Sequence, residues 1–156
     1  MHHFLDSSAL IKRYITEQGT EWVRAITPPS AGNTIIIAQV TQVEISSGVF
    51  RHRREGLIPP RTVQAIRLLL HRHVKREYMV VELTTPIIER AEDLLDKYPL
   101  RAYDAIQLAS ALIANTRLME AVLAPLVFVS ADIRLLAAAT AEELAIDDPN
   151  AHLSPL

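Results

Sequence analysis

The residues TIIIA at positions 34–38 are apolar or β-branched and show no alternation with polar residues. A strand of this composition has both faces covered, as in a parallel sheet that lies between two layers of helices. Comparable apolar runs occur at residues 3–5, 78–83 and 126–129, and a last edge strand is expected at 144–146. The run at 34–38 therefore predicts an α/β fold.

The segments between these runs have the patterns of helices. Residues 40–54 are expected to form a helix with Val40, Val43, Ser47 and Phe50 on its buried side, and Pro59-Pro60 opens a second helix with Val63, Ile66, Leu70 and Val74 inward. A helix that starts after Thr84 is expected to bury Ile87, Ile88, Ala91, Leu94 and Leu95, and residues 102–118 are apolar almost all round, as in a central helix. Strands that alternate with helices predict a three-layer α/β/α domain with a central, mostly parallel sheet of four to five strands.

The size and composition of the chain suit one domain. Its 156 residues, of which 49% are hydrophobic, are expected to form a single domain over residues 1–148, followed by a tail at 149–156. The chain has no cysteine, which excludes disulfides and thiolate metal sites. No apolar run is long enough to cross a membrane, so a cytoplasmic protein is expected.

Four acidic residues occur where such a sheet would bring them together. Asp6 and Asp132 follow strands, Glu44 lies in the helix after residues 34–38, and Asp104 lies in the first turn of the apolar helix. Ligands of parallel sheets bind outside the carboxyl ends of the strands. Carboxylates held this close repel one another unless a cation neutralises them, and hard divalent cations prefer oxygen ligands. The four acids therefore predict a metal site, although Asp6 and Asp132 could instead cap helices and Glu44 could be a surface acid.

The basic residues are concentrated in one segment. Residues 51–76 carry eight of the sixteen Lys and Arg residues and a single acid, although the whole chain has a formal net charge of −2. A segment of this charge could face a polyanion, or it could be a solvated helix surface.

Four segments of the chain resemble the PIN-domain ribonucleases, and in particular the VapC-type toxins of toxin–antitoxin pairs. The matching segments are FLDSSAL at residues 4–10, VEI at 43–45, AYDAIQLA at 102–109 and SADIRL at 130–135, and their order and spacing match the family. The last motif often begins with Thr in the family, where this chain has Ser130. A hydroxyl is retained at this position.

The resemblance implies a metal-dependent endoribonuclease that hydrolyses RNA phosphodiester bonds as the toxin of a type II module. Asp6, Glu44, Asp104 and Asp132 would be the catalytic residues and would bind one or two Mg²⁺ or Mn²⁺ ions, with the hydroxyls of Ser7 and Ser130 in contact with these carboxylates or with a phosphate. The resemblance also implies a homodimer and a small antitoxin partner whose tail blocks the acidic crevice. Phosphate contacts to the RNA are expected from Arg61, Arg67, Arg72 and Lys75, and stacking on unpaired bases from Tyr14, Tyr78 or Tyr103.

Two other classes of function remain open. A PIN-like module could bind RNA or a protein without catalysis, although such modules typically lose acids that this chain keeps. A metal-dependent phosphatase could place acids on a similar sheet, but the haloacid-dehalogenase pattern requires a second acid where this chain has Ser8. A housekeeping PIN nuclease is the alternative to a toxin.

Overall fold

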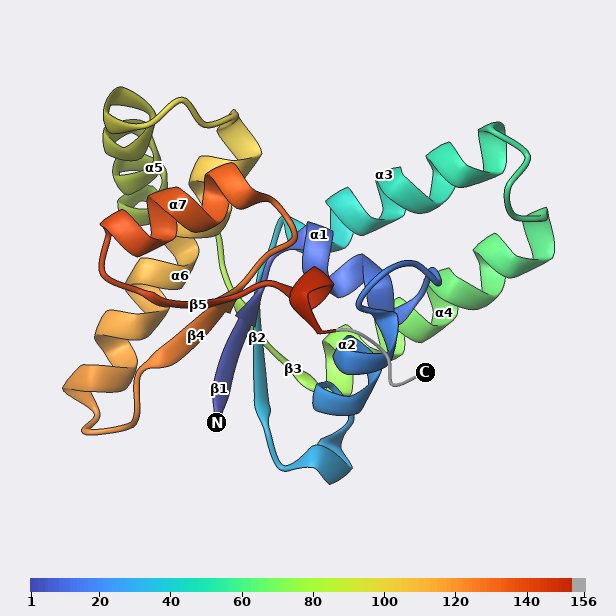
Figure 1. Cartoon of the computed structure of the whole chain (residues 1–156), viewed down its shortest axis with the longest axis horizontal. Coiled ribbons are helices and arrows are strands. Elements are labelled where there is room, and N and C mark those ends of the chain that lie inside the picture. The colour runs from blue at the N-terminus through green and yellow to red at the C-terminus, as the bar shows by residue number, and fades with distance from the viewer. Residues whose placement is uncertain (153–156) are drawn as a thin grey trace.

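The computed structural model describes residues 1–152 and contains one five-stranded sheet (Figure 1). The strand order is β3-β2-β1-β4-β5, and every neighbouring pair is parallel. The strands are β1 (His2–Leu5), β2 (Thr34–Ala38), β3 (Tyr78–Val81), β4 (Leu126–Val129) and β5 (Ala145–Asp147). The predicted parallel sheet is therefore confirmed, with five strands.

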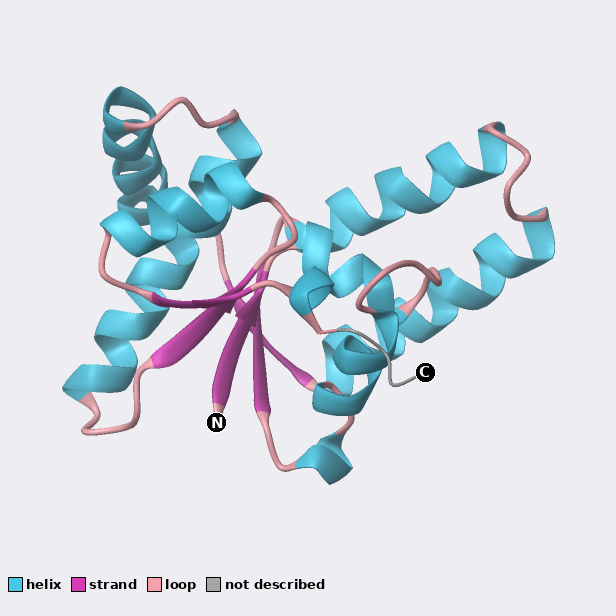
Figure 2. Ribbon diagram, viewed as in Figure 1, coloured by secondary structure: helices cyan, strands magenta, loops and turns pink. Residues whose placement is uncertain are grey.

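Helices cover both faces of the sheet (Figure 2). One layer contains α1 (Ser7–Leu10), α2 (Thr20–Ile26), α3 (Thr41–Arg54) and α4 (Pro60–Arg76), and the other contains α5 (Thr85–Lys97), α6 (Ala102–Glu120) and α7 (Ile133–Ala141). Three short 3-10 helices occur at η1 (Ile11–Arg13), η2 (Pro29–Ala31) and η3 (Pro149–Ala151). Within residues 1–152, none of the helices has the length and apolar character needed to cross a membrane. The predicted three-layer α/β/α architecture is confirmed.

Alternate strand residues pack into two separate cores. Phe4, Ile36 and Phe128 lie in a core with α5, α6 and α7. Leu5 and Ile37 lie in the opposite core with residues of α1, α3 and α4. Because successive side chains of a strand point to opposite faces, a strand that is apolar at every position contributes to both cores.

The predicted buried face of α3 is only partly correct, since Val40 and Phe50 pack against the cores but Val43 and Ser47 do not. Thr41, Ile45 and Val49 are the buried residues of this helix, whereas Val43 is 65% exposed and Ser47 is also exposed. Both sets have helical spacing, so only the placement of α3 against α1 and α4 distinguishes them.

The other helix faces agree more closely with the prediction. In α4, Val63, Ile66 and Leu70 are buried as expected. In α5, however, Ile88 and Leu95 are 45% and 41% exposed, because the helix packs mainly on α6 and buries only the narrower face formed by Ile87, Ala91 and Leu94.

The segment after β5 packs against α2. Pro149 lies against Gly19, where a Cβ atom would come within 2.4 Å of the Pro149 carbonyl oxygen and where φ is +82°. The ring of His152 stacks on Trp22 at a centroid distance of 4.1 Å. The first residues of the predicted tail at 149–156 are therefore in contact with the domain, and residues 153–156 lie outside the described part of the chain.

Candidate functional site

The fold places all four predicted acids at the same end of the sheet. Asp6 directly follows β1, and Asp132 follows the adjacent strand β4, which pairs with β1 through Leu5 and Val129. Glu44 lies in the first turn of α3 and Asp104 in the first turn of α6. The negative charges of neighbouring acids interact. The charge of Glu44 raises the pKa of Asp6, that of Asp104 raises the pKa of Glu44, and that of Asp132 raises the pKa of Asp104.

Asp6 is the most deeply buried of the four acids, with an exposed fraction of 3%. Its carboxylate caps α1 by accepting a 2.8 Å hydrogen bond from the backbone N–H of Ala9. It also accepts bonds from the hydroxyls of Ser8 at 2.8 and 2.9 Å and of Ser130 at 2.7 Å. Burial nevertheless raises the pKa of Asp6 to about 6, because these bonds offset only part of the loss of hydration.

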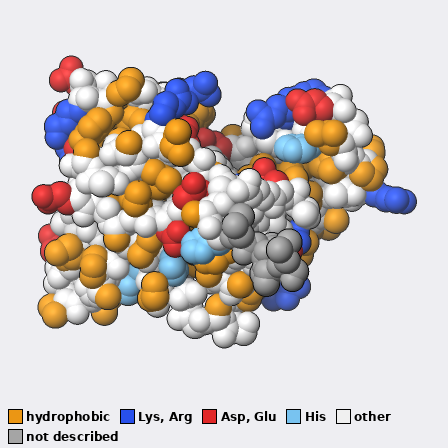
Figure 3. Space-filling view, in the orientation of Figure 1, with side chains coloured by type: hydrophobic (Ala, Val, Ile, Leu, Met, Phe, Trp, Pro, Cys, Tyr) orange, Lys and Arg blue, Asp and Glu red, His pale blue; other side chains and the backbone are white. Residues whose placement is uncertain are grey.

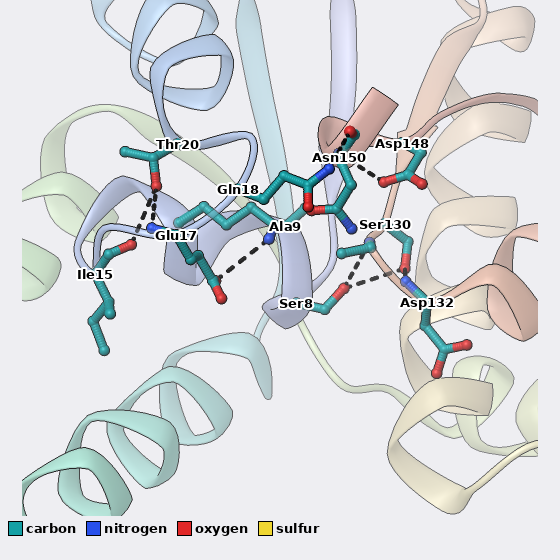
Figure 4. A network of polar contacts seen from close by, with 12 residues as sticks. Ser8, Ala9, Ile15, Glu17, Gln18, Thr20, Ser130, Asp132, Asp148 and Asn150 are labelled. Carbon is teal, nitrogen blue, oxygen red and sulfur yellow. Dashed lines mark hydrogen bonds and ion pairs between the residues drawn. The ribbon is translucent and has the colours of Figure 1, made fainter. Parts of the chain in front are cut away.

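Two serines connect the ends of β1 and β4 (Figure 4). The Ser8 hydroxyl accepts a 2.9 Å bond from the Ala131 N–H, and the Ser130 hydroxyl accepts a 3.0 Å bond from the Asp132 N–H. Ser130 contacts the carboxylate of Asp6 and Ser7 lies beside that of Glu44, where its hydrogen bonding lowers the pKa of Glu44. Ser8, which was not predicted, is the residue of the first motif that contacts Asp6. The sequence contains the Ser-Ser pair but does not indicate which of the two hydroxyls faces Asp6.

Glu44 is half-buried and is held by a residue that the sequence analysis missed. Gln107 on α6 is 1% exposed, and its Nε2 donates to Glu44 Oε2 at 2.5 Å and to Thr41 Oγ1 at 2.9 Å. Burial is the main cause that raises the pKa of Glu44, and hydrogen bonding from Gln107 and Ser7 acts in the opposite direction. The available signal was an amide within the apolar first half of this helix, because a buried amide requires hydrogen-bond partners.

Asp104 and Asp132 lie on the other side of the site. Burial raises the pKa of Asp104. Arg101 lowers it through a backbone hydrogen bond and through its charge, and the charge of Arg134 lowers it as well. Asp132 is the N-cap of α7, where it accepts bonds from the N–H groups of Arg134 and Leu135 at 2.8 and 3.4 Å. It also forms an ion pair with the Arg134 side chain at 3.6 Å. Asp6 and Asp132 therefore do cap helices, and this capping is compatible with the predicted metal-binding role.

The four acidic side chains lie near one another, but they are not arranged as a preformed metal site. In residues 1–152, no group of three or more acidic or histidine side chains is arranged to hold one ion. Each of Asp6, Glu44 and Asp132 is directed toward a protein partner. The donor set still fits a hard divalent cation, because it consists of carboxylate oxygens, and burial raises the pKa values of three of these groups, Asp6, Glu44 and Asp104.

The predicted phosphate-binding residues lie on a different surface. Arg61, Arg67, Arg72 and Lys75 are all exposed on α4, which packs against α3 and β3. Figure 1 shows α3 and α4 as an arm that extends away from the sheet, with the start of α3 at its base and the start of α4 at its tip. Glu44 lies in the first turn of α3. The other end of α4, which carries Arg72 and Lys75, leads into the start of β3, whereas the acids lie at the carboxyl ends of the strands, so the structure does not bring these residues next to the acids.

The chain belongs to the PIN-domain family, because a family model described as the PIN domain matches residues 3–139. No curated protein sequence matches the chain.

Several solved structures share the fold. VapBC2 from Rickettsia felis bound to a promoter DNA fragment aligns with a TM-score of 0.63 and 11% identity, over 95% of this chain and 98% of that one. A toxin–antitoxin complex from Klebsiella pneumoniae aligns with a TM-score of 0.63 and 18% identity, over 94% and 97%. VapC20 of Mycobacterium tuberculosis, a toxin that cleaves the sarcin-ricin loop, aligns with a TM-score of 0.58 and 16% identity, over 88% and 95%. At these identities the likeness establishes the fold.

Proposed function

We propose that this protein is a metal-dependent endoribonuclease that hydrolyses RNA phosphodiester bonds and is the toxin of a type II toxin–antitoxin module. One observation carries the proposal. Asp6, Glu44, Asp104 and Asp132 all fall within the residues that match the PIN domain and lie at one end of the sheet, where burial and the neighbouring acidic charges raise the pKa values of Asp6, Glu44 and Asp104. We assign these four residues the catalytic and metal-binding roles, with one or two Mg²⁺ or Mn²⁺ ions.

The protein contributes mainly the position and charge of its side chains. Divalent cations, when bound, lower the pKa of water and offset negative charge on a phosphodiester. Ser8 and Ser130 hold the carboxylate of Asp6, and Gln107 holds that of Glu44, so these three residues orient the proposed ligands. Arg101 and Arg134 add positive charge next to Asp104, where an anionic substrate would arrive.

A protein partner follows from the same chemistry. We propose a small antitoxin that places a basic side chain among the four carboxylates, and a homodimeric, cytoplasmic toxin. The VapBC2 structure and the Klebsiella pneumoniae complex, which share this fold, are themselves toxin–antitoxin assemblies. A short open reading frame for a DNA-binding antitoxin immediately upstream of the gene would favour a toxin over a housekeeping nuclease.

A non-catalytic PIN-like module is the second candidate. The observation in its favour is that, within residues 1–152, the acids are not arranged as a preformed cage for one ion. Such a module would bind RNA or a protein through the same surface without cleaving it.

Purified protein should cleave labelled single-stranded or structured RNA when Mg²⁺ or Mn²⁺ is present and should lose this activity in EDTA, because the carboxylates alone repel the substrate. RNA binding without cleavage, over a range of RNAs, would favour the non-catalytic module. Turnover of a small phosphomonoester with no action on RNA would instead indicate a phosphatase.

The α4 surface provides a separate test. The double variant Arg67→Glu, Arg72→Glu is expected to bind a long RNA more weakly than the wild type. The slope of log K against log salt should fall by about 1.4, because each lost contact with a phosphate of single-stranded RNA contributes about 0.7. Arg24→Glu with Arg117→Glu makes the same change in charge away from α4 and serves as the control. Equal binding by the two double variants would assign the α4 face to solvent.

A further inference from the structure

A cleft adjoins the acidic site between α1, α3 and the start of α6. We infer that this cleft binds the RNA strand beside the cleaved phosphodiester, with Arg51 and Arg101 on phosphates and Tyr103 stacked on an unpaired base. The inference rests on the proposed function and identifies a substrate-binding surface other than the α4 face.

The cleft is continuous with the acidic site. Its volume is about 510 Å³, which lies in the usual range for a ligand pocket of about 300–1,000 Å³. Glu44 lines it, together with Ser7 and Ser8, and Ser8 in turn contacts Asp6. A strand that passes through the cleft would therefore bring its next phosphate to the carboxylates.

The two sides of the cleft carry positive charge. Arg51 lies on α3 and Arg101 is the N-cap residue of α6, and both line the cleft and are exposed. Neither guanidinium has an ion pair or a side-chain hydrogen bond among residues 1–152, whereas Arg13, Arg90 and Arg134 are paired with acids. Figure 3 shows a notch between the α3–α4 arm and the other lobe, with acidic atoms inside and basic atoms on both rims.

Tyr103 offers an aromatic ring at the cleft. It is 51% exposed, and its hydroxyl has no hydrogen bond among the described residues. The other predicted stacking residues are unsuitable, because the ring of Tyr14 is partly buried against the core and Tyr78 is only 8% exposed. An exposed aromatic ring beside unpaired cations is the combination that binds single-stranded nucleic acid.

The charges of the cleft favour RNA over a basic protein segment. Arg51 and Arg101 would repel a basic side chain of an antitoxin, and would attract a phosphodiester. A basic side chain matches the four carboxylates instead, so the two binding partners would use adjacent parts of one surface.

The test measures binding of a fluorescein-labelled, five-nucleotide single-stranded RNA by anisotropy. All proteins carry Asp104→Asn, which is expected to slow cleavage enough for binding to be measured on intact RNA. Arg51→Gln and Arg101→Gln should each raise Kd about fivefold or more and reduce the salt slope by about 0.7. The matched controls are Arg54→Gln on α3 and Arg117→Gln on α6, which remove the same charge outside the cleft and should change Kd less than about twofold.

Tyr103 is tested in the same assay. Tyr103→Ala should raise Kd about tenfold, and Tyr103→Phe should restore binding, because stacking needs the ring and not the hydroxyl. All of these residues are exposed, so thermal melts of the variants should match that of the parent protein.

The outcomes separate this inference from the proposed function. If wild-type protein cleaves RNA but the Arg51, Arg101 and Tyr103 variants bind as the controls do, the inference is wrong and the proposed function stands. If the expected binding pattern appears without cleavage by the wild type, the cleft binds RNA and the nuclease assignment fails. Tighter binding of an arginine-containing peptide by Arg51→Gln and Arg101→Gln, with unchanged RNA binding, would assign the cleft to a protein partner and overturn the inference.

Discussion

Asp104→Asn is expected to slow metal-dependent RNA cleavage by roughly 10²–10³-fold, because a carboxylate at a metal centre supplies several kcal/mol of the stabilisation of the transition state. The substitution removes one negative charge and keeps an oxygen that can accept from the Arg101 N–H. Since Asp132 raises the pKa of Asp104, loss of this charge also relieves repulsion. The thermal midpoint should therefore stay equal to that of the wild type or rise slightly.

The control for this variant is Asp96→Asn. Asp96 is an exposed residue of α5, so this substitution makes the same chemical change away from the site. Initial rates of RNA cleavage at saturating Mg²⁺ or Mn²⁺ and thermal melts are measured for both. Asp96→Asn should retain full activity. Full activity of Asp104→Asn would remove Asp104 from the catalytic site and with it the strongest single element of the assignment.

The second large effect concerns stability and pH at Asp6. Burial raises the pKa of Asp6 from 3.8 to about 6 in the folded protein. Between these two values the folded state binds more protons than the unfolded state, so this group lowers the free energy of unfolding as pH rises through the window. Above pH 6 the buried charge of Asp6 lowers the free energy of unfolding by its full amount. A shift of about two pKa units corresponds to about 3 kcal/mol.

Urea denaturation in a chelator at pH 4.5 and 7.5 tests this cost. Asp6→Asn should be more stable than the wild type by up to about 3 kcal/mol at pH 7.5 and by much less at pH 4.5, because asparagine has no charge to bury. Asp93→Asn, on the exposed surface of α5, is the control for general effects of charge. A divalent cation should stabilise the wild type at pH 7.5 more than Asp6→Asn. An equal stability difference at both pH values would show that Asp6 does not carry a buried charge.

Much of the fold could be predicted from local patterns. Residues 34–38 became β2, the apolar helix became α6, and the three-layer order followed, because a strand covered on both faces must be apolar at every position. The buried face of α3 could not be predicted in this way. Val43 and Ile45 are both apolar, and only the contact of α3 with its neighbours decides that Ile45 is buried.

The candidate site shows the same division. The positions of Asp6 and Asp132 after strands, and of Asp104 at the head of an apolar helix, were visible in the sequence and place all three at one end of the sheet. The hydrogen-bond partners of the acids were not visible in the sequence. Ser8 rather than Ser7 faces Asp6, and Gln107 reaches Glu44 across the interface between α3 and α6, because these contacts depend on side-chain directions that spacing does not specify.

The sequence by itself determined the class of fold, the family and the identity of the four acids, since each depends on residue type and order along the chain. The tertiary structure alone decided how these acids are held and which positive charges lie beside them. The predicted cations of α4 lie on another surface, while Arg51 and Arg101, fifty positions apart in the sequence, line one cleft next to Glu44. Proximity between distant residues arises only when helices pack on the sheet, and electrostatic effects depend on that distance.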